Sequence, residues 1–315
     1  MSDVSMQDCP GGWLGVDAIQ QACASRFPAL SATAPRLFGR SLSESRSPYL
    51  LYKAWYDVLG NEPAYPAQQI GDCVSFGHGH ASDLLQCVEI SLEALTVGED
   101  SLLESGQGAA EYREIDTEFI YATSREVAGI LGGAEGSYGA AAVKAMTSIG
   151  LVSREMLGEE GVYNGDRAQM WGRTGVPADL KLQAASFRLG SAALVTTWDE
   201  LEGALTSGYP VTICTDQRFC LTRDEQGFCK PEGILGHCMF IAGVRFDRPG
   251  ACILQSWGPD VPTGPRALDQ PSFSFWADRS VVEAILAQGD SWALSMAPEF
   301  VTRLLPEHWS YNTAA

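Results

Sequence analysis

The fold is decided by one stretch of sequence, Gln68-Gln69-Ile70-Gly71-Asp72-Cys73-Val74-Ser75-Phe76-Gly77. A Gln/Gly turn leads to Cys73, and an apolar run with nearly helical spacing follows it as far as Leu95. The pattern predicts a long, mostly buried helix with Cys73 in its first turn. At that position the helix dipole and free backbone N–H groups favour the thiolate. Most free cysteines, however, are small core residues, so both interpretations stay open here.

Bulk composition narrows the class of protein. The 315 residues suit one two-lobed domain or two closely packed ones. A net charge of −18 argues against nucleic acid or an anionic membrane surface as a partner. The start of the chain has no signal-peptide pattern, and no stretch approaches the roughly 18 apolar residues that span a bilayer. We therefore expect no membrane association.

Cysteine usage indicates a reducing compartment. The nine cysteines are odd in number and scattered, with no C-x-x-C pair. We expect reduced thiols and a cytoplasmic location, or a virion-associated one if the chain is phage-encoded. No pair of residues has metal-ligand spacing, so we expect no metal and no cofactor.

Residues 1–64 are predicted to be an N-terminal extension to the main fold. It contains two candidate helices, at 16–27 and 48–59, and the second has Ser47 as N-cap and Pro48 at its first position. Such a segment either covers a cleft, as a propeptide does, or pads the surface. Padding is the expectation here.

The remaining chain divides into a helical lobe at 65–157, a β-rich lobe at 158–298 and a frayed tail at 299–315. In the helical lobe we expect, after the Cys73 helix, a linker at 97–112, helices at 117–127 and 140–149, and a glycine-dense loop at 129–139. In the β-rich lobe we expect a polar crossing segment at 158–177 and a turn-rich excursion at 216–235. The Thr197-x-x-Glu200 capping box predicts the start of one helix, and a second helix is expected at 281–288. Strands are expected at 192–196, 209–215, 237–246, 251–257, 272–277 and 291–296. This order predicts an α+β, two-lobe fold.

A catalytic thiol needs a base, and the chain has four histidines. His78 and His80 follow Cys73 too far along one helix to share its proton, so they are expected to be structural, and no third ligand makes them a metal site. His308 lies in the expected tail. His237, at a glycine-flanked strand start, is the best candidate, although a lone histidine on an apolar strand is more often a core residue.

Gln255 is the candidate partner of His237. If the two strands pair through the turn at 247–250, the Gln255 amide oxygen can accept the imidazole N–H and fix its tautomer. Trp257 could then cover that bond from water and strengthen it.

Three motifs in this order resemble those of papain-like cysteine peptidases: Q-Q-I-G-D-C-V-S-F, G-H-C-M-F-I-A-G-V and I-L-Q-S-W-G. The resemblance extends over about residues 65–298 and includes Gly208-Tyr209-Pro210-Val211, which is similar to the family's Gly-Pro-Val strand. The finer pattern looks most like papain-like proteins encoded by bacteria and tailed phages. The resemblance implies the papain-like two-lobe fold, with an antiparallel β-barrel-like second lobe.

The resemblance also implies roles for individual residues. Cys73 would be the nucleophile, His237 the base and acid, and Gln255 the orienting residue. Gln68 and the backbone N–H of Cys73 would form the oxyanion hole. Gly132, Gly133 and Trp257 would contact the substrate, with the glycines forming the backbone wall of a substrate pocket.

Two departures from the family pattern affect these roles. Gln255 stands where the family has asparagine, so its carbonyl must be repositioned. Ala67 stands where the family has its oxyanion glutamine, and Gln68 is one residue later. Loss of one oxyanion donor typically costs about 10²–10³ in turnover.

Three functions fit these observations. The first is a cysteine endopeptidase that hydrolyses polypeptides through a Cys-His-Gln triad and an acyl-enzyme. The second is a catalytically weak or inactive papain-fold component of a phage or bacterial assembly. The third is a Cys-His amidase that cuts cell-wall peptides.

Overall fold

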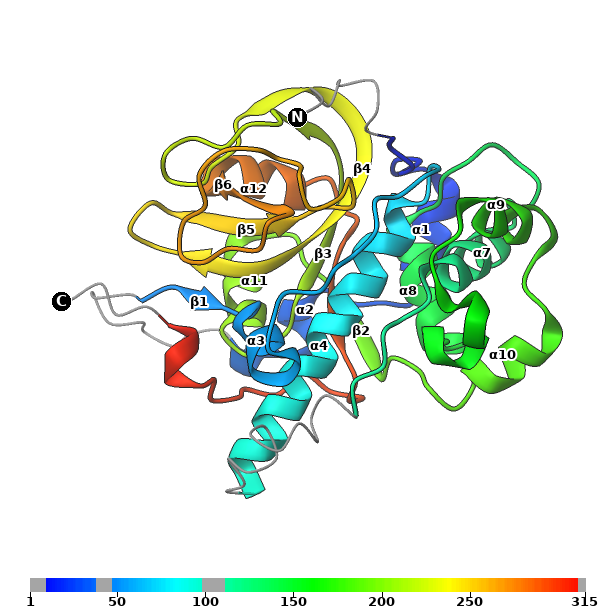
Figure 1. Cartoon of the computed structure of the whole chain (residues 1–315), viewed down its shortest axis with the longest axis horizontal. Helices are drawn as coiled ribbons and strands as arrows, with labels where there is room; N and C mark the ends of the chain where they lie inside the picture. Colours follow the sequence, from blue (N-terminus) through cyan, green and yellow to red (C-terminus); the bar gives the residue numbers. More distant parts are fainter. Residues whose placement is uncertain (1–9, 38–46, 98–110, 311–315) are drawn as a thin grey trace.

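Helix α4 (Cys73–Val97) runs through the middle of the molecule, with helices on one side and a sheet on the other (Figure 1). The computed structural model describes residues 10–37, 47–97 and 111–310. Every residue of α4 from Cys73 to Val88 is buried, which is typical of a helix that protein surrounds on all sides. The long buried helix that the sequence predicts is therefore confirmed.

The described helices are α1 (Ala18–Ala24), α2 (Leu30–Thr33), α3 (Lys53–Leu59), α4, α7 (Thr117–Ala128), α8 (Gly139–Ser148), α9 (Gly165–Thr174), α10 (Ala178–Ala184), α11 (Trp198–Leu205) and α12 (Arg279–Leu286), with short 3-10 turns η2 (Pro35–Leu37), η3 (Arg154–Gly161) and η4 (Glu307–Trp309). The described strands are β1 (Tyr49–Leu50), β2 (Ser191–Leu194), β3 (Val211–Phe219), β4 (Pro231–Arg245), β5 (Gly250–Leu254), β6 (Ser274–Asp278) and β7 (Ser291–Ser295).

Within the described residues the strands form one antiparallel sheet in the order β2-β7-β3-β4-β5-β6, with β1 paired to β4. The sheet is open, because β2 and β6 form its two ends and do not pair with each other. The α+β expectation is confirmed, whereas the strands predicted to form a barrel-like second lobe form an open sheet.

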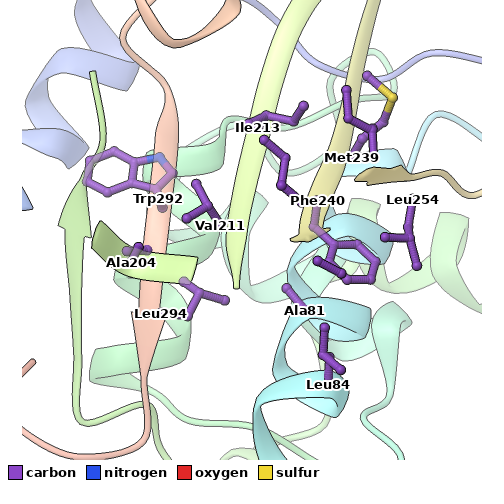
Figure 2. Packing of buried hydrophobic residues seen from close by; sticks show 14 of the residues in the cluster. Ala81, Leu84, Ala204, Val211, Ile213, Met239, Phe240, Leu254, Trp292 and Leu294 are labelled. Carbon is purple, nitrogen blue, oxygen red and sulfur yellow. The ribbon is translucent and has the colours of Figure 1, made fainter. Parts of the chain in front are cut away.

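The main core lies where α4 packs on the sheet. Ala81 and Leu84 of α4 lie beside Phe240 of β4 and Leu254 of β5, in a buried cluster that also includes Trp292 of β7 (Figure 2). A strand with apolar residues at every second position packs closely on a helix whose apolar residues repeat about every 3.6 positions. This packing places the start of α4 against the middle of β4.

Local sequence signals explain several helix ends. The capping box at Thr197 is present, with Glu200 accepting from the N-cap backbone. Asp116 caps α7 by accepting from Phe119 N at 2.7 Å, and Gly129 ends that helix in the left-handed conformation. The glycine-dense loop that follows was predicted correctly from its composition.

Other predictions were wrong where tertiary pairing overrides local pattern. The helix predicted at 48–59 begins at Lys53, because Tyr49 and Leu50 pair with β4 instead. The polar segment 158–177 contains α9, which Asn164 caps. The excursion at 216–235 is shorter than predicted, since β3 and β4 continue to pair as far as Phe219 and Pro231.

The tail is ordered as far as residue 310. His308 Nε2 lies 2.9 Å from Asp57 Oδ2, and Trp309 donates to the same carboxylate at 2.7 Å. The prediction that His308 frays was therefore wrong. Most of the predicted linker, residues 98–110, lies outside the described residues. No helix in the described part of the chain has both the length and the apolarity needed to cross a bilayer.

Candidate active site

Cys73 lies at the junction of α4 and β4. The backbone N–H of Cys238 on β4 donates to Cys73 Sγ at 3.3 Å. The helix and strand approach closely because residue 77 is glycine: a Cβ there would lie 2.8 Å from Cys238 Sγ. His237 precedes Cys238, so the same strand carries the predicted base up to the thiol.

The thiol of Cys73 is held in its uncharged form. Its side chain is fully buried, and burial raises the pKa of Cys73 well above the usual thiol value, with Cys238 and Asp72 adding to the effect. The expectation that the start of the helix favours a thiolate was wrong for this state. Desolvation outweighs the helix dipole here, because the charge would have no contact with water.

His237 is also uncharged and buried, with 1% of its surface exposed. Its ring stacks on Trp257 with centroids 4.5 Å apart. Neither ring nitrogen has a hydrogen-bond partner among the described residues. Burial lowers the pKa of His237 to about 3. The structure thus brings His237 and Trp257 together as the sequence predicts, but it forms no hydrogen bond between His237 and Cys73.

This shift in pKa makes stability depend on pH. The unfolded imidazole takes up a proton near pH 6.5, whereas the folded one stays neutral down to about pH 3. Between these values the unfolded state binds more protons, so stability falls as the pH falls, by about 1.4 kcal/mol per unit. We expect the stability advantage of the wild-type chain over His237→Gln to shrink by roughly 2–3 kcal/mol between pH 6.5 and 4.5. Denaturant titration of both chains measures this, and parallel pH curves would contradict it.

Gln255 does not reach His237. Its amide oxygen accepts from Trp257 N, and its Nε2 donates to Gly258 O at 3.2 Å and to Val261 O. These three side-chain bonds therefore all serve the turn that follows β5. The predicted hydrogen bond between Gln255 and His237 is absent, and the Trp257 ring is what contacts the imidazole.

Gln68 is also engaged within the protein. Its Nε2 donates to Ile70 O at 2.9 Å, its Oε1 accepts from Ser256 Oγ, and its backbone N–H donates to Ser256 O at 2.8 Å. These bonds join the turn before Cys73 to the end of β5. Gln68 thus links the Cys73 motif to the Gln255 motif in this structure.

The glycine-dense loop is built around Arg125. The buried guanidinium of Arg125 donates to Ile130 O, Gly133 O and Ala134 O at 2.8–3.1 Å and also to Gly136 O. Gly132 and Gly133 lie on the exposed side of this loop. The backbone that faces the site is instead Gly136 and Ser137. A substrate contact at Gly132 and Gly133 therefore stays a prediction.

The N-terminal segment, residues 10–14, lies across the site. Gly12 N and Trp13 N both donate to Gly236 O, at 2.8 and 3.2 Å. On the other side, Ser137 N donates to Gly12 O at 2.8 Å, and Leu14 N donates to Ser137 O at 3.1 Å. The dark-blue chain that leads into α1 follows this course beside β4 (Figure 1). The expectation that this part of the extension pads the surface was wrong.

Two tryptophans fasten the segment at its ends. Trp257, which stacks on His237, donates through Nε1 to Pro10 O at 3.0 Å. Trp13 Nε1 donates to Asp290 Oδ2 at 2.8 Å. The segment is therefore bonded to Gly236, the residue before His237, and to Trp257, the ring that stacks on His237.

The other histidines have structural partners. His78 Nδ1 lies 2.8 Å from Val74 O, and its Nε2 lies 3.1 Å from Thr212 Oγ1. His80 stacks on Tyr65 with ring centroids 3.5 Å apart. In the described ranges no group of three or more His, Cys, Asp or Glu side chains is arranged to hold a metal ion.

Sequence reasoning missed the residues that close the site. The relevant signal was Pro10-Gly11-Gly12-Trp13, a turn-like composition next to a large aromatic residue. Asp290 was also assigned no role from the sequence. Its contacts come from segments far apart in the sequence, so no local pattern marks them.

Comparison with known proteins supports the fold. No family model matches the sequence, and no curated protein matches it. The structure is similar to that of xylellain, a cysteine protease from Xylella fastidiosa, with a TM-score of 0.61, 14% identity, and coverage of 91% of this chain and 96% of that one. It is also similar to procathepsin B S9 from Trypanosoma congolense, with a TM-score of 0.58, 11% identity, and coverage of 92% and 87%. The chain therefore has the fold of papain-like cysteine proteases.

Proposed function

We propose that the chain is a cysteine peptidase that hydrolyses polypeptides through an acyl-enzyme on Cys73. The observation that carries this proposal is the contact between the start of α4 and β4. There the nucleophile accepts a hydrogen bond from the residue next to His237. Nucleophile and base candidates thus come from two elements that the core holds rigidly.

The chemistry begins once residues 10–14 leave the site. Water then solvates Cys73 and His237, and the imidazole takes the thiol proton. The thiolate attacks the peptide carbonyl carbon, and the Cys73 N–H at the helix N-terminus donates to the developing oxyanion. The imidazolium gives its proton to the departing amine, and water hydrolyses the thioester.

In this proposal the two glutamines act by positioning other groups. Gln255 holds the turn that carries Trp257, and the Trp257 ring orients the imidazole. Gln68 becomes an oxyanion donor only if its amide leaves Ile70 O. The described state is therefore a closed, resting form.

Loosening the N-terminal segment is expected to activate the enzyme. In the Trp13→Ala chain the bond to Asp290 is lost, and a hydrogen bond to a charged group contributes about 1.5–3 kcal/mol. We expect hydrolysis of an unstructured polypeptide, and alkylation of Cys73 by iodoacetamide, to rise about tenfold or more over wild type. Peptide mapping by mass spectrometry identifies the labelled thiol.

Val16→Ala is the matched control, because Val16 is exposed and lies two residues beyond the segment. It should leave both rates near those of the wild-type chain. Equal rates in Trp13→Ala and wild type would show that the segment does not control access to Cys73.

A second candidate function is a non-catalytic papain-fold component of a phage or bacterial assembly. The absence of a hydrogen bond from His237 to either Cys73 or Gln255 favours it. Under this alternative, Cys73 becomes more reactive in the Trp13→Ala chain, but neither polypeptide nor purified peptidoglycan is cut. Cleavage of peptidoglycan alone would instead identify an amidase.

A further inference from the structure

We propose that the cleft beside Cys73 selects a Gly-Gly segment of a polypeptide, and that Gly11-Gly12 occupies it as an intramolecular mimic. This inference rests on the proposed peptidase function and specifies its substrate. The cleft walls are two backbones: Gly71, two residues before Cys73, and Gly236, immediately before His237.

There is no room for a side chain at the second position of the mimic. A Cβ on Gly12 would lie 2.5 Å from the carbonyl carbon of Gly71 and 3.0 Å from its Cα, where real Cβ contacts essentially never fall below 3.0 Å. These are backbone atoms just before α4, so they cannot rotate aside as a flexible side chain can. The wall thus excludes any residue larger than glycine.

The first position is restricted from the other side. A Cβ on Gly11 would lie 2.9 Å from Leu235 Cδ1 and closer still to Gly236 O. The wall residue Gly236 also has no space for a side chain, because a Cβ on it would lie 2.5 Å from Trp13 O. Gly11 therefore packs on Gly236 and Leu235, and Gly12 packs on Gly71.

Space, rather than backbone conformation, explains these glycines. Gly11, Gly12, Gly71 and Gly236 are absent from the glycines with positive φ, so each has a backbone that other residues adopt without strain. A turn would tolerate asparagine or aspartate at such positions. A slot this narrow does not.

The bonds that hold the mimic are available to any Gly-Gly peptide. Gly12 N donates to Gly236 O, Gly12 O accepts from Ser137 N, and Pro10 O accepts from Trp257 Nε1. All three use backbone atoms of the mimic. They supply affinity, while the walls supply selectivity.

The test measures occupancy of the cleft separately from hydrolysis. The full-length Gly12→Ala chain, whose own segment no longer fits, is alkylated with iodoacetamide in the presence of synthetic peptides. The probes are acetyl-Ser-Pro-Gly-Gly-Trp-Leu-amide and the same peptide with Ala-Ala, Ala-Gly or Gly-Ala at the centre. Serine stands at the Cys9 position so that the probe carries no thiol. If the Gly12→Ala chain does not fold, the Trp13→Ala chain takes its place.

We expect the Gly-Gly peptide to protect Cys73 at concentrations about tenfold or more below those that the Ala-Ala peptide needs. The two single-alanine peptides should each bind more weakly than Gly-Gly. Equal protection by Gly-Gly and Ala-Ala peptides, or protection by neither, would overturn the inference. Selective protection by the Gly-Gly peptide without its cleavage would support the Gly-Gly selectivity of the cleft and contradict the proposed peptidase activity.

Discussion

Replacing Cys73 with alanine in the Trp13→Ala chain is expected to lower the rate of peptide hydrolysis by at least about 10³-fold. The thiolate is the only group in the proposal that bonds to the substrate, so its removal eliminates the acyl-enzyme. Any residual rate would come from binding and the oxyanion donor. Hydrolysis of an unstructured polypeptide, followed by mass spectrometry of the products, measures the loss.

The informative comparison is with the other thiols. Burial alone would raise the pKa of Cys238, but hydrogen bonds with Cys214 and His78 lower it to about 7. Cys238 is therefore the rival nucleophile. The partly exposed Cys220 provides the control. Adding Cys220→Ser to the Trp13→Ala chain should leave its rate of hydrolysis unchanged. Activity that survives Cys73→Ala and disappears in Cys238→Ala would show that Cys238, and not Cys73, is the nucleophile.

The closed site explains why one structure can hold a nucleophile and a base in unreactive forms. Both pKa shifts have burial as their largest cause, one raising the thiol value and the other lowering the imidazole value. Water entering the cleft weakens both effects at once. In our proposal the departure of residues 10–14 therefore changes access and protonation together, so the same event would admit the substrate and favour proton transfer.

The sequence predicted those parts of the fold that follow from local pattern. The α4 helix is defined by apolar spacing over many turns, and the His237 strand by a continuous apolar run. The capping box at Thr197 needs only neighbouring residues to form. The order of three motifs along the chain was enough to indicate the papain-like fold, because each motif includes residues of α4, β4 or β5.

The details of the site depend on contacts that sequence spacing does not encode. Gln255 was expected to bond to His237, but the chain turns back so that Gly258 O and Val261 O lie closer to its amide. The charge state of Cys73 was expected to follow the helix dipole, but it depends on how much water the folded chain excludes. Gly11 and Gly12 looked like loop residues, and their fit against Gly71 and Gly236 appears only in three dimensions.

Asp290 holds together three parts of the closed molecule. Its carboxylate is fully buried and accepts five hydrogen bonds. The donors are Trp13 Nε1, Gln20 Nε2, Gly139 N, Ala140 N and Trp292 Nε1. Two of them are backbone N–H groups at the start of α8, where a negative charge is favoured. Asp290 thus joins the N-terminal segment, the helical lobe and β7.

We expect Asp290→Asn to destabilise the chain by about 3–5 kcal/mol. Oδ1 accepts from three donors and Oδ2 from two, so either orientation of the asparagine amide turns its NH₂ group toward at least two N–H donors. Those donors lose their partner at a fully buried site. Denaturant unfolding measures the loss, with the exposed Asp260→Asn as a control that changes charge equally.

The same substitution distinguishes a general loss of stability from a specific role in closure. If the amide places its nitrogen on the Oδ2 side, Trp13 loses its anchor, and alkylation of Cys73 should rise under conditions where the chain is still folded. A chain that is destabilised but still protects Cys73 would place the amide the other way and leave Trp13 bound. A chain as stable as the Asp260→Asn control would contradict the proposed role, since five donors would then have lost their charged acceptor at no cost.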